Sequence, residues 1–284
     1  MFMAFEQVSY TYPCAPVSAL QSLSLQIPQG KKCALLGQNG SGKTTLFRLA
    51  NGLFRPDHGH VYWRDKPLKY DRATLSQLRQ NVGLVFQNPE QQLVATTVEE
   101  DLSYGLFNLG LPESDIHDRV HTALQDFNLA ELAHSPVNHL SLGQKKRVAI
   151  ADVMILQPEL LLLDEPTAYL DPRHRHEVLQ QLAQIHASGT TIVMATHDLD
   201  LVYRWADWVF VLDRGQLILE GKPDDVFGQR DVLEALQLGV PMAIRLLEHL
   251  QAWYWAQDGR DRPTLEAVQQ ELRHVLQFTQ SGQN

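Results

Sequence analysis

The feature that most constrains this chain is a glycine-rich turn between a short apolar run and an amphipathic stretch. The turn at Gly37–Thr44 reads Gly-Gln-Asn-Gly-Ser-Gly-Lys-Thr and matches the P-loop pattern at every position. It follows the apolar run Lys31–Leu36, which is typical of a buried strand, and leads into a helix predicted from Ser41 onward. A strand, a tight turn and a helix in this order indicate an α/β fold.

The turn predicts a site for the phosphates of a nucleoside triphosphate. Glycines let the backbone turn so that consecutive N–H groups point at phosphate oxygens, and the following helix presents the positive end of its dipole to the same anion. The lysine supplies a positive charge to the β- and γ-phosphates, and the hydroxyl after it is a natural Mg²⁺ ligand. The predicted nucleotide-binding residues of this turn are Gly37, Asn39, Gly40, Ser41, Gly42, Lys43, Thr44 and Thr45.

A second apolar run, Leu160–Leu163, ends in two adjacent carboxylates, Asp164 and Glu165. Ligands of parallel α/β sheets gather at the carboxyl ends of the strands. Asp164 is predicted to hold Mg²⁺ or its water, and Glu165 to orient and polarise the attacking water, because phosphoryl transfer depends on positioning and charge neutralisation. His197 ends another apolar run and reaches the same edge, although a strand-end histidine taken alone is more often structural.

The remaining pattern favours a largely parallel sheet with three additions. Further buried strands are predicted at 82–86 and 190–196, and helical stretches such as 148–156 and 175–186 lie between the strands. The additions are an antiparallel sheet from segments such as 5–12 and 61–64, a mostly helical region at about 98–156, and two amphipathic helices at 242–255 and 264–278.

Charge, cysteines and hydropathy exclude several functional classes. The formal net charge is −9, from 24 Lys+Arg and 33 Asp+Glu, which disfavours broad binding of nucleic acid. Cys14 and Cys33 form neither a disulfide framework nor a metal-site spacing, which favours a reducing compartment. No run approaches the roughly 20 apolar residues that span a bilayer, so we expect any membrane role to act through a partner.

Further motifs make the chain resemble the ATP-binding cassette (ABC) family, the nucleotide-binding subunits of ABC transporters, over roughly residues 5–225. Leu140–Gln144 looks like the family signature, and Ala168–Asp171 is similar to its D-loop. Gln87 fits the glutamine of the Q-loop, and His197 fits the switch histidine. The resemblance implies a P-loop NTPase core of ABC type with an added antiparallel β subdomain, a helical subdomain and a small helical C-terminal extension.

The resemblance also implies the domains, the cofactors and the site. We expect an ABC ATPase domain over residues 1–225, with the helical subdomain at about 98–156, and a C-terminal helical extension over 226–284. ATP and Mg²⁺ are the implied cofactors. The implied catalytic residues are Glu165, His197 and Gln87, and the implied Mg²⁺ ligands are Thr44, Gln87 and Asp164. The aromatic ring that stacks on adenine is predicted to be Tyr12, with Tyr10 as the alternative.

The signature predicts a second anion-binding helix start, because Ser141 is a good N-cap for the helix that follows. In this family the signature contacts the ATP of the other subunit, so the resemblance implies a head-to-tail dimer with the same chain or a paralogue. Leu142 stands where glycine is usual, and it is tolerated if its side chain points away from the nucleotide and no positive φ is needed. The residues implied at the shared ATP are Ser141, Gly143, Gln144 and Asp171.

A narrower resemblance lies in Val85–Leu93, Thr97–Leu102 and Tyr104–Leu111, which look like the ATPases of energy-coupling-factor importers. It implies that the segment after Gln87 contacts integral membrane subunits and that the chain lies peripherally on the cytoplasmic face of the membrane. We therefore expect the ATP-hydrolysing subunit of an importer of cobalt or nickel ions. The alternatives are a vitamin importer, another type of ABC transporter, and a soluble ABC ATPase that acts on nucleic acid or the ribosome.

Overall fold

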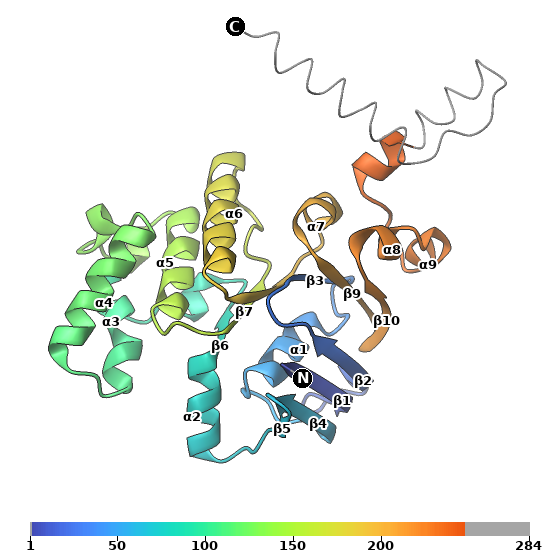
Figure 1. Ribbon diagram of the computed structural model, residues 1–284, viewed down its shortest axis with the longest axis horizontal. Coiled ribbons are helices and arrows are strands. Elements are labelled where there is room, and N and C mark those ends of the chain that lie inside the picture. The colour runs from blue at the N-terminus through green and yellow to red at the C-terminus, as the bar shows by residue number, and fades with distance from the viewer. Residues whose placement is uncertain (1, 248–284) are drawn as a thin grey trace, which may run out of the picture.

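A mostly parallel sheet forms the centre of the protein, whose computed structural model describes residues 2–247 (Figure 1). In these residues the strand order is β10-β9-β3-β8-β7-β6, and all neighbours pair in parallel except β10, which runs antiparallel to β9 at one edge. The predicted parallel sheet is thus confirmed. The strands are β3 Lys32–Leu36, β6 Val82–Val85, β7 Leu160–Asp164, β8 Thr191–Ala195, β9 Trp208–Asp213 and β10 Gln216–Gly221.

Strand β7 is covered on both faces, and all five of its residues are buried. Successive side chains of a strand point to opposite faces. Leu161 and Leu163 therefore join the core on the side of α5 and α6, whereas Leu160 and Leu162 join the core on the side of α1 and the antiparallel sheet. Burial on both faces explains why the strand is an unbroken run of leucines rather than an alternating pattern.

The predicted antiparallel sheet is confirmed, with strand order β2-β1-β4-β5 in the described part of the chain. The sequence analysis missed β2, because a bulge interrupts the alternation of its apolar side chains. Ser22 of β2 has φ 47°, and the register between β2 and β1 shifts between Val8 and Tyr10 of β1. The strands are β1 Met3–Tyr10, β2 Leu20–Ile27, β4 His58–Trp63 and β5 Lys66–Pro67.

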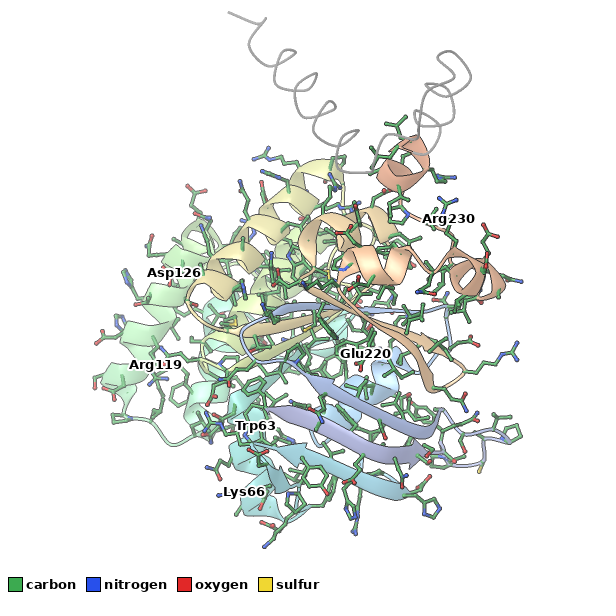
Figure 2. All side chains as sticks on the ribbon, turned by 45° about the vertical axis from the view of Figure 1, so that its right-hand side comes forward. Trp63, Lys66, Arg119, Asp126, Glu220 and Arg230 are labelled. Atoms are coloured by element: carbon green, nitrogen blue, oxygen red, sulfur yellow. The ribbon has the colours of Figure 1, made fainter. Side chains whose placement is uncertain are left out.

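Helices flank the parallel sheet, and α3, α4 and α5 lie together on the side away from the antiparallel sheet (Figure 1). Arg119 and Asp126 mark the outer surface of α4 in this region (Figure 2). The predicted helices at 148–156 and 175–186 correspond to α5 and α6. The first helices are α1 Lys43–Ala50, α2 Arg72–Asn81, α3 Val98–Asn108, α4 Glu113–Asp126 and α5 Leu142–Met154. The later ones are α6 Pro172–Ala187, α7 Leu199–Trp205, α8 Pro223–Phe227 and α9 Arg230–Ala235.

The residues after β10 pack on the sheet as far as the structure describes them. Val226, Phe227 and Leu233 share a buried cluster with Leu36 of β3 and Val211 of β9. The amphipathic helices expected at 242–255 and 264–278 lie outside the described residues, apart from a helical segment at 242–247. The domain boundaries expected near residues 98, 156 and 225 stay predictions. No helix among residues 2–247 combines the length and the hydropathy of a membrane span.

Gly83 in β6 is packed too closely by α5 to carry a side chain. A Cβ added to it would lie 2.2 Å from Cγ1 of Val153 and 3.2 Å from Cγ of Pro158. Overpacking of this kind costs about 1–3 kcal/mol. We expect Gly83→Ala to lower the free energy of unfolding by that amount, as measured by urea denaturation.

The double variant Gly83→Ala/Val153→Ala is the control, because it removes the methyl group that the new Cβ would meet. Its free energy of unfolding should be higher than the value obtained by adding the losses of the two single variants, since the two sites are in contact. Unchanged stability of Gly83→Ala would show that β6 and α5 pack less tightly than described.

Candidate functional site

The P-loop connects β3 to α1, as predicted, and two of its glycines have no room for a side chain. A Cβ on Gly37 would lie 2.4 Å from the carbonyl oxygen of Leu212, and one on Gly42 would lie 2.6 Å from Cδ2 of Leu20. Gly42 also has φ 106°, a conformation that favours glycine. The loop is thus wedged between the antiparallel sheet and the end of β9, which holds its backbone in a single shape.

Lys43 lies inside this loop, where its Nζ donates to the carbonyl oxygens of Gly37 at 2.7 Å and Gln38 at 3.0 Å. Burial lowers the pKa of the Lys43 ammonium, and the carboxylates of Glu165 and Asp164 act in the opposite direction. The remaining loop residues behave differently: Asn39 and Gly40 are exposed, whereas Ser41 is buried and its Oγ has no hydrogen-bond partner. An unpaired buried hydroxyl in a phosphate loop is a group that a ligand could satisfy.

The structure brings together Thr44, in the first turn of α1, and Asp164, at the end of β7. The Thr44 hydroxyl donates to Oδ2 of Asp164 at 2.6 Å. Burial raises the pKa of the Asp164 carboxyl, and the bond from Thr44 lowers it in part. A hydroxyl and a buried carboxylate are oxygen donors of the kind that Mg²⁺ takes, so these residues fit the cation. Gln87 is exposed two residues beyond Val85, which pairs with Leu163, so the register places it at this edge too.

Glu165 and His197 form a second pair at the same edge. Glu165 directly follows β7, and His197 follows β8. Oε1 of Glu165 lies 2.8 Å from Nδ1 of His197. Because a carboxylate only accepts, Nδ1 of His197 is the donor in this hydrogen bond. The Glu165 side chain is 11% exposed and the His197 side chain 73%, so the glutamate is held in a dry position while the histidine reaches outward.

Tyr12 and Tyr10, the two candidates for stacking on adenine, have different neighbours. The Tyr12 hydroxyl is 3.0 Å from Oγ1 of Thr45, the residue after Thr44 in α1. Tyr10 instead stacks face to face on Phe54, with ring centroids 4.9 Å apart and an interplanar angle of 9°. Tyr12 meets Phe54 edge-on, at an interplanar angle of 88°. Tyr12 thus lies beside α1, and its stacking on adenine stays a prediction.

The signature forms the N-terminus of α5 through a capping box. The hydroxyl of Ser141 accepts from the Gln144 N–H at 3.3 Å, and Oε1 of Gln144 accepts from the Ser141 N–H at 2.8 Å. Leu142 is the first helical residue, is 39% exposed and does not have a positive φ, so glycine is not required there for backbone reasons. Gly143 is required for packing, because a Cβ would lie 2.6 Å from the ring of His174.

Two predicted ligands have local partners in this structure. The Gln144 side chain closes the capping box, and Asp171 caps α6. The Asp171 carboxylate accepts from the His174 N–H at 3.0 Å and lies 2.5 Å from Nδ1 of the same histidine. The bonds from His174 lower the pKa of Asp171. Both residues thus cap helix starts, and the sequence analysis had not found this role.

Two contacts near the site were not predicted. Lys146 is buried, and its Nζ donates to the backbone beyond β7. Gln38 of the P-loop donates from Nε2 to the carbonyl oxygen of Leu236 at 2.8 Å, so the segment after β10 touches the phosphate loop. Neither contact has a sequence signal, because the partners are 19 or more residues away and are brought close only by the fold.

A groove of about 350 Å³ lies beside the segment that follows Gln87. Its rim includes three exposed apolar side chains, and Asp101 and Asp152 line it as well. Burial and the neighbouring Asp101 raise the pKa of Asp152 to about 7. The exposed apolar side chains of the rim are Leu53, Val94 and Tyr104.

Comparisons with known proteins agree with the site. Residues 20–168, more than half of the chain, match the family model described as ABC transporter. A protein of Nostoc sp. that carries the general designation ABC transporter ATP-binding protein is 66% identical over 239 residues, which cover 84% of this chain and 87% of that protein. The energy-coupling factor transporter ATP-binding protein EcfA of Methanocaldococcus jannaschii is 42% identical over 241 residues, which cover 85% and 86%.

A solved structure gives the same result. The structure of cbiO1 from Clostridium perfringens, part of the ABC transporter complex cbiONQ, matches with a TM-score of 0.74 and 40% identity over 87% of this chain and 98% of that one. The resemblance to energy-coupling-factor ATPases is thus confirmed. The matched residues include the P-loop, the signature and the two carboxylates after β7. The chain therefore belongs to the ABC transporter family, as one of its ATP-binding and ATP-hydrolysing subunits.

Proposed function

We propose that this ABC ATPase drives an energy-coupling-factor importer of cobalt or nickel ions from the cytoplasmic face of the membrane. The observation that carries the motor role is the pairing of Glu165 with His197 beside the bond between Thr44 and Asp164. The type of importer is supported by the similarity to EcfA and cbiO1. The cargo rests on the sequence resemblance alone, and a vitamin is the alternative cargo.

Hydrolysis follows from the positions of these side chains. The P-loop N–H groups and Lys43 bind the β- and γ-phosphates, and Tyr12 stacks on the adenine. Thr44, Asp164 and Gln87 would hold Mg²⁺, which when bound neutralises charge on the phosphate oxygens. Glu165 orients the attacking water and accepts its proton, and His197, which is held at Nδ1 by Glu165, turns Nε2 toward the γ-phosphate.

A second ATPase subunit is needed to complete the site. The residues of α1 and α5 join the cores on opposite faces of β7, so the P-loop and the signature serve different faces of the chain. We infer a head-to-tail dimer in which the signature and the D-loop of one subunit face the ATP bound by its partner, through Ser141, Gly143, Gln144 and Asp171. The partner is a second copy of the chain or a paralogue.

The groove beside the Q-loop is the proposed contact with the integral membrane subunits. It is lined by Phe86 and Gln92, which lie on either side of Gln87 in the sequence, and it exposes Val94 at 68% and Tyr104 at 56%. Exposed apolar side chains around a hollow are typical of a protein interface. Since the groove lies between the β6 strand and α3, movement of a docked membrane helix would follow movement of the Q-loop.

Glu165→Gln tests the catalytic assignment. The variant keeps the size of the side chain but cannot accept a proton, so we expect turnover of ATP to fall by about 100-fold or more. ATP binding should persist. In size-exclusion chromatography with ATP the dimer should accumulate, because hydrolysis no longer opens the closed state.

Glu159→Gln is the matched control, since Glu159 precedes the same strand at its other end and pairs with Arg64. It should leave the turnover within about twofold of the unsubstituted chain, as expected for a change at an exposed ion pair. Near-normal turnover of Glu165→Gln, with no dimer in ATP, would refute the role of Glu165.

Val94→Arg tests the groove in the complex from native membranes. A charged side chain on the apolar rim should reduce recovery of integral membrane subunits in a detergent pull-down to below about a tenth, a loss of 1.4 kcal/mol or more in affinity. The ATPase activity of the isolated chain should not change. Mass spectrometry of the proteins that co-elute with the unsubstituted chain identifies a metal-type or a vitamin-type binding subunit.

Val17→Arg is the control for this experiment, because Val17 is 66% exposed and lies away from the groove residues. It should leave recovery of the membrane subunits unchanged. Equal recovery with both variants would place the membrane contact elsewhere, and recovery of soluble partners alone would refute the transport function.

A further inference from the structure

A buried lysine ties the signature helix to the segment that carries the catalytic glutamate. Lys146, in the second turn of α5, is 3% exposed. Its Nζ donates to the carbonyl oxygen of Glu165 at 2.9 Å and to that of Ala168 at 3.0 Å. The same two residues close a turn, because the Ala168 N–H donates to the Glu165 carbonyl at 3.2 Å. One ammonium thus holds both ends of the turn that leads away from β7.

The backbone around this turn adopts conformations that side chains disfavour. Glu165 has φ 47°, and Tyr169, directly after the turn, has φ 62°. Such values are uncommon for residues other than glycine and persist only where the surroundings impose them. The Tyr169 side chain is 86% exposed, so its own packing does not impose the conformation. The two bonds from Lys146 are contacts that do act on this backbone.

The neighbouring basic residues of the helix have different partners. Lys145 pairs with Glu90, which is exposed, and Arg147 pairs with Glu177 of α6. Lys146 instead points inward, and burial lowers the pKa of its ammonium to about 8, against the opposite effect of Glu165 and Asp164. A buried ammonium is costly unless its donors are satisfied, and here backbone carbonyls satisfy two of the three.

We propose that Lys146 is a positioning residue for Glu165, which fixes the backbone of the glutamate and joins it to the signature helix. The inference rests on the catalytic role proposed for Glu165. Without the lysine, the Glu165–Ala168 turn is free to relax from its strained conformation, and the carboxylate leaves the position from which it orients water. ATP binding by the P-loop is not affected, because the lysine does not reach it.

The test compares Lys146→Met with Lys145→Met in the full chain. Methionine keeps the length of the side chain and removes its donors, and the control makes the same change at the neighbouring position. We expect Lys146→Met to lower kcat about tenfold or more, a loss of roughly 1.4 kcal/mol in transition-state stabilisation, with KM for ATP within twofold. Lys145→Met should leave both constants unchanged. Lys146→Gln, which retains a donor, should have an intermediate kcat and serves if Lys146→Met does not fold.

A double-mutant cycle separates positioning from a general structural effect. If Lys146 acts through Glu165, then adding Lys146→Met to Glu165→Gln lowers turnover by less than about twofold, because the two residues act as a unit. Two outcomes would overturn this inference but not the proposed function. In the first, the loss of turnover caused by Lys146→Met adds in full to the loss caused by Glu165→Gln. In the second, Lys146→Met leaves kcat unchanged while Glu165→Gln is inactive. Normal turnover of Glu165→Gln would overturn the proposed function and the inference with it.

Discussion

The burial of β7 in the middle of the parallel sheet is the constraint on which the site depends. The strand is paired on both sides and covered on both faces, so its end cannot shift without disturbing both cores. Asp164 and Glu165 are therefore delivered to fixed points at the sheet edge. Thr44 and His197 come from neighbouring elements that pack on the same strand, and their bonds to the two carboxylates follow from this shared support.

The site holds two carboxylates close together in a largely buried position, and two buried lysines lie near them. Lys43 and Lys146 both approach the carboxylates from buried positions, and burial lowers the pKa of both ammonium groups. Both lysines bond to backbone carbonyls rather than directly to a carboxylate. The proposed roles of the carboxylates, holding a cation and orienting a water, are compatible with this arrangement, because neither lysine occupies their oxygens.

The P-loop and the signature belong to helices that pack on different faces of the parallel sheet. Each of them lies at the start of its helix, α1 for the P-loop and α5 for the signature. Lys146, in the signature helix, bonds to the backbone of Glu165. The segment after β10, which the sequence analysis had treated as an extension, also touches the P-loop through Gln38. The segment after β10 is thus in direct contact with the phosphate loop.

The elements whose signals are local could be predicted from the sequence. The glycines of the P-loop, the leucines of β7, the carboxylates at its end and the cap at Ser141 each act through neighbours within a few residues, so pattern and spacing predict them. Three features emerge only in the fold, namely the bulged strand β2, the stacking of Tyr10 on Phe54, and the burial of Lys146. These depend on residues far apart in the chain, and a basic side chain on a helix looks the same in sequence whether it faces water or a backbone carbonyl.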